Sequence, residues 1–416
     1  MKEHVSNLLL SIVIPTKNRQ EYALAAVESA LRLSARNSEV EVIIRDCSDN
    51  DSLRGLLNSK FSDDGRYHYT YDPSKPSMTK NWDLAFSEAC GLYVCGIGDD
   101  DAVLLNILDV VNYMVSNDID CMRQPMIHYF WPGSFLDSYN SGKIVFPQRM
   151  AGAVWEIDLE KSYNSKIAAC GFGYTHELPN AYHAIIKNSV LQEHRLLCGN
   201  IFNGTSLDAY SSFAFTKYIR VMAVTDFPFS IHGACPSSNT NRLNQKDKSL
   251  YKVHFDEFDD LKMPNFLPKL FSSEVSIAES AIVALQDTSR EHDIAKMNLA
   301  HVYGKSAALN LDMLVSLYAQ YRIFQKPNRF AFGFSAAFRY YLTQRVRKAS
   351  VGTCISLITR VSPSLVAYIL NRFGNSNRVS CSNIREACLE VELGLPQNMS
   401  ELCGASSDIS LSQHKV

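Results

Sequence analysis

The first third of the chain alternates between short apolar runs and segments whose apolar residues recur at helical spacing. Unbroken runs of Leu, Ile and Val at residues 8–14 and 40–44 are typical of strands buried on both faces of a parallel sheet. Further strands are predicted at residues 67–71 and 92–95. Helices are predicted between the strands, over residues 21–33, 53–57 and 79–89. This alternation predicts an α/β fold with a mostly parallel sheet.

The remaining chain continues this pattern and then leaves it. Strands are predicted within residues 184–186 and 221–231, and helices over 189–197 and 210–217. From about residue 246 the periodicity is helical, with helices predicted over 272–286 and 288–320, the second starting at a capping box at Thr288. We therefore expect an α/β region and a mostly helical region. Their predicted bounds are residues 1–245, with halves 1–117 and 118–245, and residues 246–416.

Composition narrows the class of protein. Hydrophobic residues make up 46% and charged residues 20% of 416 residues, as in ordinary globular proteins. The net charge of −2 predicts no nucleic-acid partner. Eleven cysteines without a C-x-x-C pair are typical of reduced thiols, and we expect a cytoplasmic protein. No secretory signal is predicted, and no run reaches the ~20 apolar residues that cross a bilayer.

Three adjacent carboxylates, Asp99, Asp100 and Asp101, follow the apolar run at residues 92–95. Carboxylates repel one another at such a tip unless a divalent cation lies between them, and hard cations prefer oxygen ligands. Ligands also bind at the carboxyl ends of strands in open α/β sheets. The alternative is a solvated acidic loop, with Asp101 near a helix N-terminus.

Four segments place these carboxylates in a wider pattern. In order and spacing, IVIPTKNR, VEVIIRDCSDNDS, MTKNWDLAFSEACGLYV and GIGDDD resemble the motifs of family-2 glycosyltransferases of the GT-A fold. The resemblance covers about the first 115 residues and returns faintly near Asp208 and His232. It implies a Rossmann-like, mostly parallel sheet that binds a nucleotide sugar, followed by an acceptor-binding half.

The resemblance implies which residues bind the nucleotide part of the donor. They are Pro15, Thr16, Asn18, Arg19, Asp46, Lys80, Asn81 and Asp99. The alternatives are a strand-to-helix turn, an Asx-type turn at Asp46 and a solvated Lys80. The sequence departs from the family pattern at Arg45, where a second acid is usual, and at Cys47, where a glycine is expected. Arg45 could bind a phosphate or form a surface salt bridge.

The resemblance also implies a divalent metal, Mn²⁺ or Mg²⁺, bound to the leaving diphosphate. One register places the metal site at Asp99 and Asp100, and another at Asp100 and Asp101, so Asp100 is common to both. His232, in a loop after a predicted strand, is a further candidate ligand. The alternative for His232 is a structural role.

Asp208 matches the position at which the family carries a catalytic acid opposite the leaving group. An inverting transfer needs a base within hydrogen-bond reach of the acceptor hydroxyl. The alternative is that Asp208 caps the following helix.

These observations predict a hexosyltransferase-like enzyme. It would move a sugar from a nucleotide-diphosphate sugar to a hydroxyl of a glycan or lipid-linked acceptor, with inversion, as in surface polysaccharide biosynthesis. The rivals are a sugar nucleotidyltransferase, weakened because no Gly-rich loop follows the first strand, and an inactive nucleotide- or glycan-binding scaffold. The helical region could pack on the enzyme, form a homo-oligomer, or contact the inner face of a membrane through residues 330–348.

Overall fold

The computed structural model describes most of the chain. The described residues are 8–34, 38–62, 65–134, 141–147, 150–174, 177–238, 263–270, 272–324, 333–361 and 378–395. The predicted boundary at residue 245 lies outside them.

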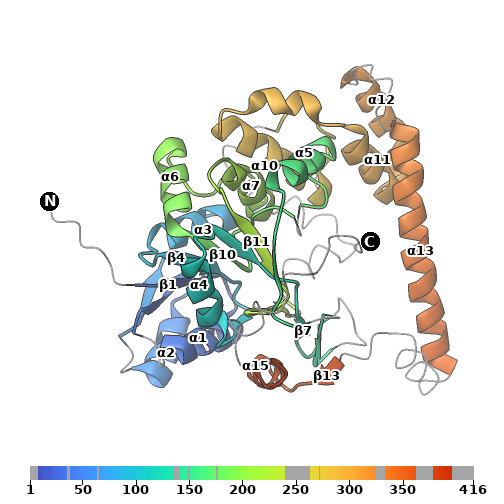
Figure 1. Ribbon diagram of the computed structural model, residues 1–416. Helices are drawn as coiled ribbons and strands as arrows, with labels where there is room; N and C mark the ends of the chain where they lie inside the picture. Colours follow the sequence, from blue (N-terminus) through green and yellow to red (C-terminus); the bar gives the residue numbers. More distant parts are fainter. Residues whose placement is uncertain are drawn as a thin grey trace.

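An eight-stranded sheet forms the centre of the molecule (Figure 1). Its order is β3 (Tyr67–Tyr71), β2 (Val40–Asp46), β1 (Leu10–Thr16), β4 (Tyr93–Gly96), β10 (Ala184–Lys187), β6 (Cys121–Arg123), β11 (Met222–Thr225) and β9 (Val154–Glu156). Only β10 and β9 run against the other strands. The arrangement confirms the predicted GT-A class of fold, with a mostly parallel sheet and a helical C-terminal region.

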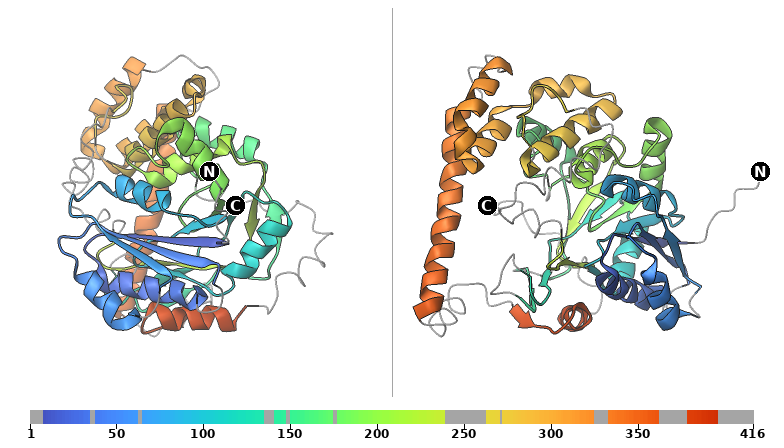
Figure 2. Two further views of the ribbon diagram at one scale, coloured as in Figure 1. Left: turned by 90° about the vertical axis from the view of Figure 1, so that its left-hand side faces the viewer. Right: turned by 180° about the vertical axis from the view of Figure 1, so that it is seen from behind.

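Helices cover both faces of this sheet (Figure 2). Alternate residues of β1 point to opposite faces, so Ile12 and Ile14 pack with one set of helices and Val13 with another. The first set is α1 (Gln20–Ser34), α2 (Ser52–Phe61) and α4 (Ile107–Ser116). The second set is α3 (Met78–Ser87), α5 (Leu159–Ala168), α6 (Asn188–Cys198) and α7 (Leu207–Ala214), which η1 (Phe215–Lys217) extends.

A smaller sheet continues from the acidic segment. Its order is β13 (Arg378–Ser380), β8 (Lys143–Val145), β7 (His128–Phe130), β12 (Ser230–Ala234) and β5 (Ala102–Val103). Helix α15 (Ile384–Leu393) packs beside it and is joined to α1 by an ion pair of 2.6 Å between Arg32 and Glu392. A late segment of the chain therefore completes the surroundings of an early helix.

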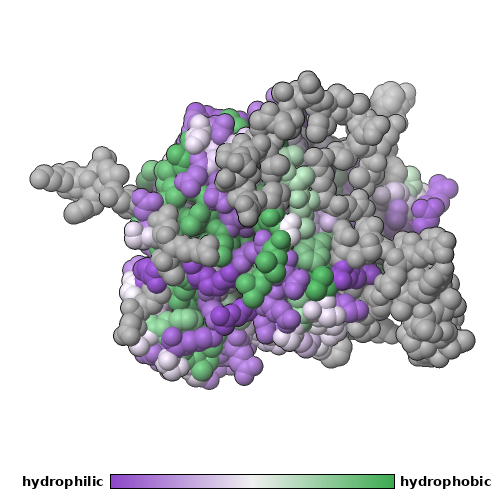
Figure 3. Space-filling view, turned by 60° about the horizontal axis from the view of Figure 1, so that its bottom comes forward, coloured by the Kyte–Doolittle hydropathy of each residue, from purple (hydrophilic) through white to green (hydrophobic). Residues whose placement is uncertain are grey.

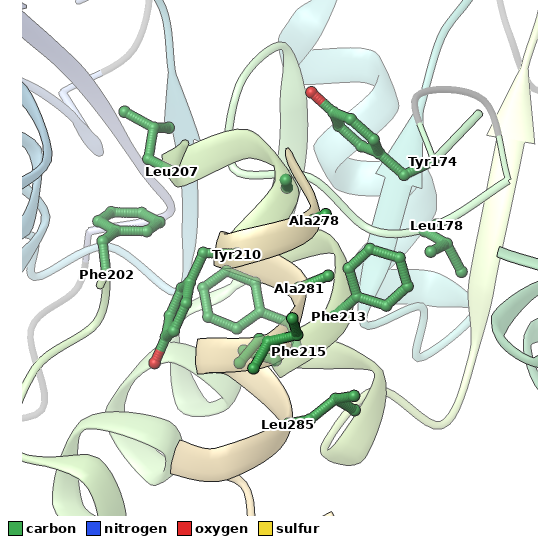
Figure 4. Packing of buried hydrophobic residues seen from close by; sticks show 14 of the residues in the cluster. Tyr174, Leu178, Phe202, Leu207, Tyr210, Phe213, Phe215, Ala278, Ala281 and Leu285 are labelled. Atoms are coloured by element: carbon green, nitrogen blue, oxygen red, sulfur yellow. The ribbon is translucent and has the colours of Figure 1, made fainter. Parts of the chain in front are cut away.

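The helical region shares a core with the α/β region. Helix α10 (Ser273–Asp287) packs on α7, and Tyr210, Phe213 and Phe215 lie among Ala278 and Leu285 (Figure 4). The other elements are η2 (Glu291–Lys296), α11 (Ala300–Leu309), η3 (Leu311–Met313), α12 (Leu314–Phe324) and α13 (Phe334–Val361). One apolar cluster therefore runs from the large sheet into the helical region.

The predicted helix over residues 288–320 is wrong at its start. Thr288 is the C-cap of α10, and both its backbone N–H and its hydroxyl donate to the carbonyl of Ala284. Ser289 then takes a positive φ of 56°, which a continuing helix does not allow. The remaining stretch is broken into η2, α11, η3 and α12.

The surface is chemically mixed. Hydrophilic and hydrophobic residues are interleaved over the face seen in Figure 3. Among the helices that the structure describes, none has the length and apolar character needed to span a membrane.

Candidate active site

The acidic triplet forms a tight turn at the carboxyl end of β4. The backbone N–H of Gly98 donates to Asp101 Oδ2 at 2.6 Å, and all three carboxylates are buried. A Cβ at Gly98 would lie 2.9 Å from Asp101 Oδ2 and 3.5 Å from Asp100 Oδ1. The turn therefore brings two carboxylates around a position that only glycine can occupy without displacing one of them.

Asp99 is held by the loop that follows β1. Its two oxygens accept hydrogen bonds from the Thr16 hydroxyl and from Arg19, each at 2.8 Å. Burial raises the pKa of Asp99, although Arg19 and Thr16 oppose this shift. For Arg19, burial lowers the pKa, but the facing carboxylates of Asp99 and Asp100 outweigh it and raise the pKa overall. The structure thus brings together three of the predicted nucleotide-binding residues.

Asp100 faces both Arg19 and the loop after β12. One oxygen lies 3.7 Å from Arg19 Nη1, and the other accepts the backbone N–H of Cys235 at 2.9 Å. Burial, together with Asp101 and Asp99, raises the pKa of Asp100 to about 7. The Trp131 indole N–H donates to the Asp100 carbonyl at 2.8 Å and fixes the backbone of the turn.

Asp101 belongs to a cluster of histidines. His183 Nε2 lies 3.0 Å from Asp101 Oδ2, and the backbone N–H of Gly233 donates to Oδ1 at 2.7 Å. Ligand atoms of Asp101, His183 and His232 all lie within 4.8 Å of one another. Burial alone would raise the pKa of Asp101, but His183, His232 and Tyr182 together outweigh it and lower that pKa.

The two histidines differ in their partners. His183 Nδ1 is 2.7 Å from the Ser230 hydroxyl, which fixes the ring with Nε2 toward Asp101. His232 Nδ1 is buried and has no hydrogen-bond partner within the described part of the chain. Burial lowers the pKa of His232 to about 4, so the imidazole is neutral at physiological pH and keeps a free lone pair. Together with the Asp101 carboxylate, the two imidazoles present three donor atoms of the kind that bind a transition metal.

Gly233 lets β12 approach the triplet. A Cβ at Gly233 would lie 1.7 Å from the Asp100 carbonyl oxygen, far inside any contact distance. The missing side chain of Gly233 allows this close approach. The backbone of β12 therefore supplies hydrogen bonds to the triplet without an intervening side chain.

His183, which precedes β10, is not among the residues predicted from the sequence. Because β10 is antiparallel to β4, its first residues meet the last residues of β4, and the His183 N–H donates to the Gly96 carbonyl at 3.0 Å. A histidine beside a strand end is a visible signal, as at His232. The start of β10 lies beside the end of β4 only because β10 is antiparallel, and this direction depends on tertiary packing.

Asp208 lies one residue inside α7, whose N-cap is Ser206. Its side chain is partly exposed, and Arg123, His183 and Asp101 are the charged groups that act on it. Burial raises the pKa of Asp208 to about 6, with Arg123 opposing the shift. Asp208 is therefore within electrostatic reach of His183 and Asp101 and does not occupy the N-cap position.

The loop before Asp208 is held by the helical region. Glu279 of α10 accepts hydrogen bonds from the backbone N–H and the hydroxyl of Thr205, at 2.9 and 2.8 Å. The backbone N–H of Ser206 donates to the Ser280 hydroxyl at 2.8 Å. Helix α10 thus orients the start of α7 and with it Asp208.

The predicted base-binding carboxylate, Asp46, has both oxygens engaged within the chain. They accept from the Ser48 N–H and the Tyr69 hydroxyl, each at 2.9 Å. Asn18 joins the loops after β1 and β2, because its amide exchanges hydrogen bonds with Asp49. The structure therefore places the predicted nucleotide-binding loops side by side. Both oxygens of Asp46 already accept hydrogen bonds from neighbouring residues.

The remaining predicted residues lie around this region. Pro15 is buried inside β1. The Asn81 amide donates to the Arg45 carbonyl at 3.3 Å, and more than half of the Lys80 side chain is exposed, with its amine 2.8 Å from Asp83.

Arg45 forms ion pairs instead of facing the triplet. Its guanidinium lies 2.7 Å from Asp72 and 3.0 Å from Glu88. This geometry supports the salt-bridge interpretation of the departure from the family pattern.

Comparison with known proteins relates the N-terminal segment to one family. Residues 11–147 match the model of glycosyl transferase family 2. This match confirms the predicted resemblance of the N-terminal segment to family-2 glycosyltransferases.

Individual relatives match parts of the chain. An Escherichia coli K12 protein described as a colanic acid biosynthesis glycosyl transferase, WcaA, is 34% identical over 106 residues, which are 25% of this chain and 37% of that protein. A glycosyltransferase of Rickettsia bellii is 26% identical over 152 residues, 35% of this chain and 21% of its own length. The chain thus spans well under half of these relatives. The solved structure of S. aureus TarS 1–349 with UDP-GlcNAc has a TM-score of 0.44 at 16% identity, and the match covers 77% of this chain and 93% of that one.

Proposed function

We propose that this protein transfers a glycosyl group from a nucleotide-diphosphate sugar to a hydroxyl of a glycan or lipid-linked acceptor. The observation that carries the proposal is the convergence of the acidic triplet, two histidines and Asp208 at one edge of a sheet. The strands that deliver the triplet lie in the segment that matches glycosyl transferase family 2. Biosynthesis of a surface polysaccharide is the proposed setting, in keeping with the name of the E. coli relative.

The donor is proposed to lie over the loops after β1 and β2. Pro15, Thr16, Asn18 and Arg19 would form one wall, and Asp46, Lys80, Asn81 and Asp99 would complete the nucleotide contacts. Arg19 is the group best suited to a diphosphate, because its guanidinium is a fixed cation beside Asp99 and Asp100 and its planar fork matches the geometry of phosphate oxygens.

The donor atoms at the triplet fit a divalent metal. Asp101, His183 and His232 present three ligand atoms within 4.8 Å, and His232 Nδ1 is buried without a hydrogen-bond partner among the described residues. Asp100 is proposed as a fourth ligand, and Asp99 is less suited because Thr16 and Arg19 occupy both of its oxygens. When bound, Mn²⁺ or Mg²⁺ would neutralise the charge of the leaving diphosphate.

Asp208 is the proposed catalytic base. Its carboxylate would take the proton of the acceptor hydroxyl as the acceptor oxygen bonds to the anomeric carbon. The bond from that carbon to the diphosphate oxygen breaks at the same time, so attack from the opposite face inverts the configuration. An ionised Asp208 near an oxocarbenium-like transition state would also stabilise its positive charge.

The proposed location is the cytoplasm. The nine cysteines that the structure describes are all free, in keeping with a reducing compartment.

Thermal unfolding tests the donor site. Melting temperatures of the purified protein would be measured with UDP, GDP, CDP and dTDP, each with and without Mn²⁺, and with Asp100→Asn. We expect one nucleoside diphosphate to raise the melting temperature in a Mn²⁺-dependent way, because a ligand of the folded state stabilises it. Asp100→Asn should lose this rise, and Asp109→Asn, an exposed acid of α4, should keep it.

Two outcomes would contradict the proposal. If no nucleotide stabilised the wild type, the donor site would be rejected. If nucleotide binding were normal but no acceptor mixture yielded product, an inactive scaffold would be the better description.

A further inference from the structure

The charge of the chain is strongly uneven. Residues 313–385 contain eleven Lys and Arg residues and no Asp or Glu, although the whole chain carries a net charge of −2. Such a run of one sign is an electrostatic signature of an anionic partner. Helices α12 and α13 are built from this run.

Helix α12 is apolar on two faces. Leu317 and Tyr321 are buried in the helical region. Val315 and Ile323 are 81% and 74% exposed, and with Leu311, at 51%, they recur at multiples of four residues along one side. An exposed aliphatic stripe of this kind marks a surface that contacts a partner.

The start of α13 continues this surface. Its Phe334 packs against α12, with its ring 5.1 Å from that of Tyr318. On the exposed side, Arg339 and Arg347 flank Val346, which is 55% exposed. Neither arginine has an acidic partner among the residues that the structure describes.

Both helices lie at the outer edge of the molecule, away from the large sheet (Figures 1 and 2). Exposed aliphatic groups of α12 and exposed cationic groups of α13 are therefore both offered at this outer edge, away from the large sheet.

We propose that α12 and the first half of α13 bind an anionic lipid bilayer peripherally. Lipid head groups attract the arginines, while the exposed aliphatic side chains enter the boundary between head groups and acyl chains. A soluble polyanion would use the cations and leave Val315 and Ile323 in water. The binding is at the surface, because the exposed arginines of α13 exclude burial of its whole circumference. This inference does not depend on the proposed transferase activity.

Co-sedimentation with vesicles tests the proposal. The full-length protein would be mixed with vesicles of neutral phosphatidylcholine alone or with added anionic phosphatidylglycerol. We expect binding only to the anionic vesicles, and weaker binding as salt is added, because counterions screen the attraction. Val315→Ser with Ile323→Ser, and separately Arg339→Gln with Arg347→Gln, should each weaken binding about tenfold.

The matched control is Leu196→Ser with Leu197→Ser on α6, since these side chains are 86% and 65% exposed but lie outside the cationic run. This variant should bind anionic vesicles like the wild type. Unchanged melting temperatures would show that all variants are folded.

Four results would overturn the proposal. They are no vesicle binding by the wild type, equal binding to neutral vesicles, loss of binding in the α6 control, and vesicle binding by Val315→Ser with Ile323→Ser that equals that of the wild type. If the wild type bound no vesicles but formed a concentration-dependent dimer, and Val315→Ser with Ile323→Ser abolished that dimer, the surface would be assigned to a second copy of the chain.

Discussion

The acidic triplet and Asp208 face one cluster but are held in different ways. The triplet is fixed by backbone groups of the sheets, at Gly98, Gly233 and Cys235. Asp208 is fixed through a loop that hydrogen-bonds to Glu279 in the helical region. The proposed metal side of the site is thus part of the α/β fold, whereas the proposed base side depends on a helical region without a recognisable motif.

The largest effect is expected from Asp101→Asn. An amide cannot match the carboxylate toward His183 and the Gly98 and Gly233 N–H groups at once, and it removes a charge that would bind the metal. We expect turnover to fall about a thousandfold or more, with loss of Mn²⁺-dependent stabilisation. Turnover and melting temperature with and without Mn²⁺ would be measured. A variant with more than a tenth of wild-type turnover would remove Asp101 from the metal site.

Asp208→Asn should separate binding from chemistry. Loss of a general base is expected to lower kcat about a hundredfold to ten-thousandfold, while donor-induced thermal stabilisation stays near that of the wild type. Equal losses in donor binding and kcat would indicate that Asp208 supports the donor site instead.

The pH profile sharpens the same comparison. Because burial raises the pKa of Asp208 to about 6, the basic form predominates above that pH and is lost as the pH falls through it. Wild-type kcat should therefore decline on the acid side with an apparent pKa near 6. Initial rates at saturating substrate between pH 5 and 8 would check this, and a flat profile would exclude the deprotonated carboxylate as the base.

A smaller effect is expected from Glu279→Ala. The change removes the acceptor of the Thr205 N–H and one of the partners of its hydroxyl, so the free energy of unfolding should fall by about 1–3 kcal/mol. In the folded protein kcat should fall more than Mn²⁺-dependent donor binding, since the triplet does not touch α10. Denaturant unfolding and kinetics would be compared with Glu291→Ala, an exposed acid for which a change within about 0.5 kcal/mol is expected. Equal damage to both sides of the site would show that the two supports are not separate.

The smallest effect is expected from Tyr69→Phe. Removing one hydrogen bond to Asp46 should cost about 1 kcal/mol of unfolding free energy. Donor-induced stabilisation should not decrease, because the released carboxylate oxygen becomes available to a ligand. A clear loss of donor binding would mean that Tyr69 orients Asp46 for the nucleotide.

The contrast between the two sides of the site also explains which features could be predicted from the sequence. The strands at residues 8–14 and 40–44 and the triplet are local patterns, and their order along the chain carries the family motifs. His183 required the direction of β10, and Glu279 required the docking of α10 some seventy residues after Thr205. Thr288 fits a capping box in the sequence, yet in the structure it is the C-cap of α10, because tertiary packing overrides the local signal.

The ion pair between Arg32 and Glu392 joins residues 360 positions apart. At the usual rates of translation, roughly 20–70 s separate the synthesis of the two side chains on the ribosome. During that interval the face of α1 that receives α15 has no partner from its own chain. The surroundings of α1, the first helix to emerge from the ribosome, are therefore among the last parts of the molecule to be completed. A nascent chain truncated before residue 378 would leave that face of α1 uncovered.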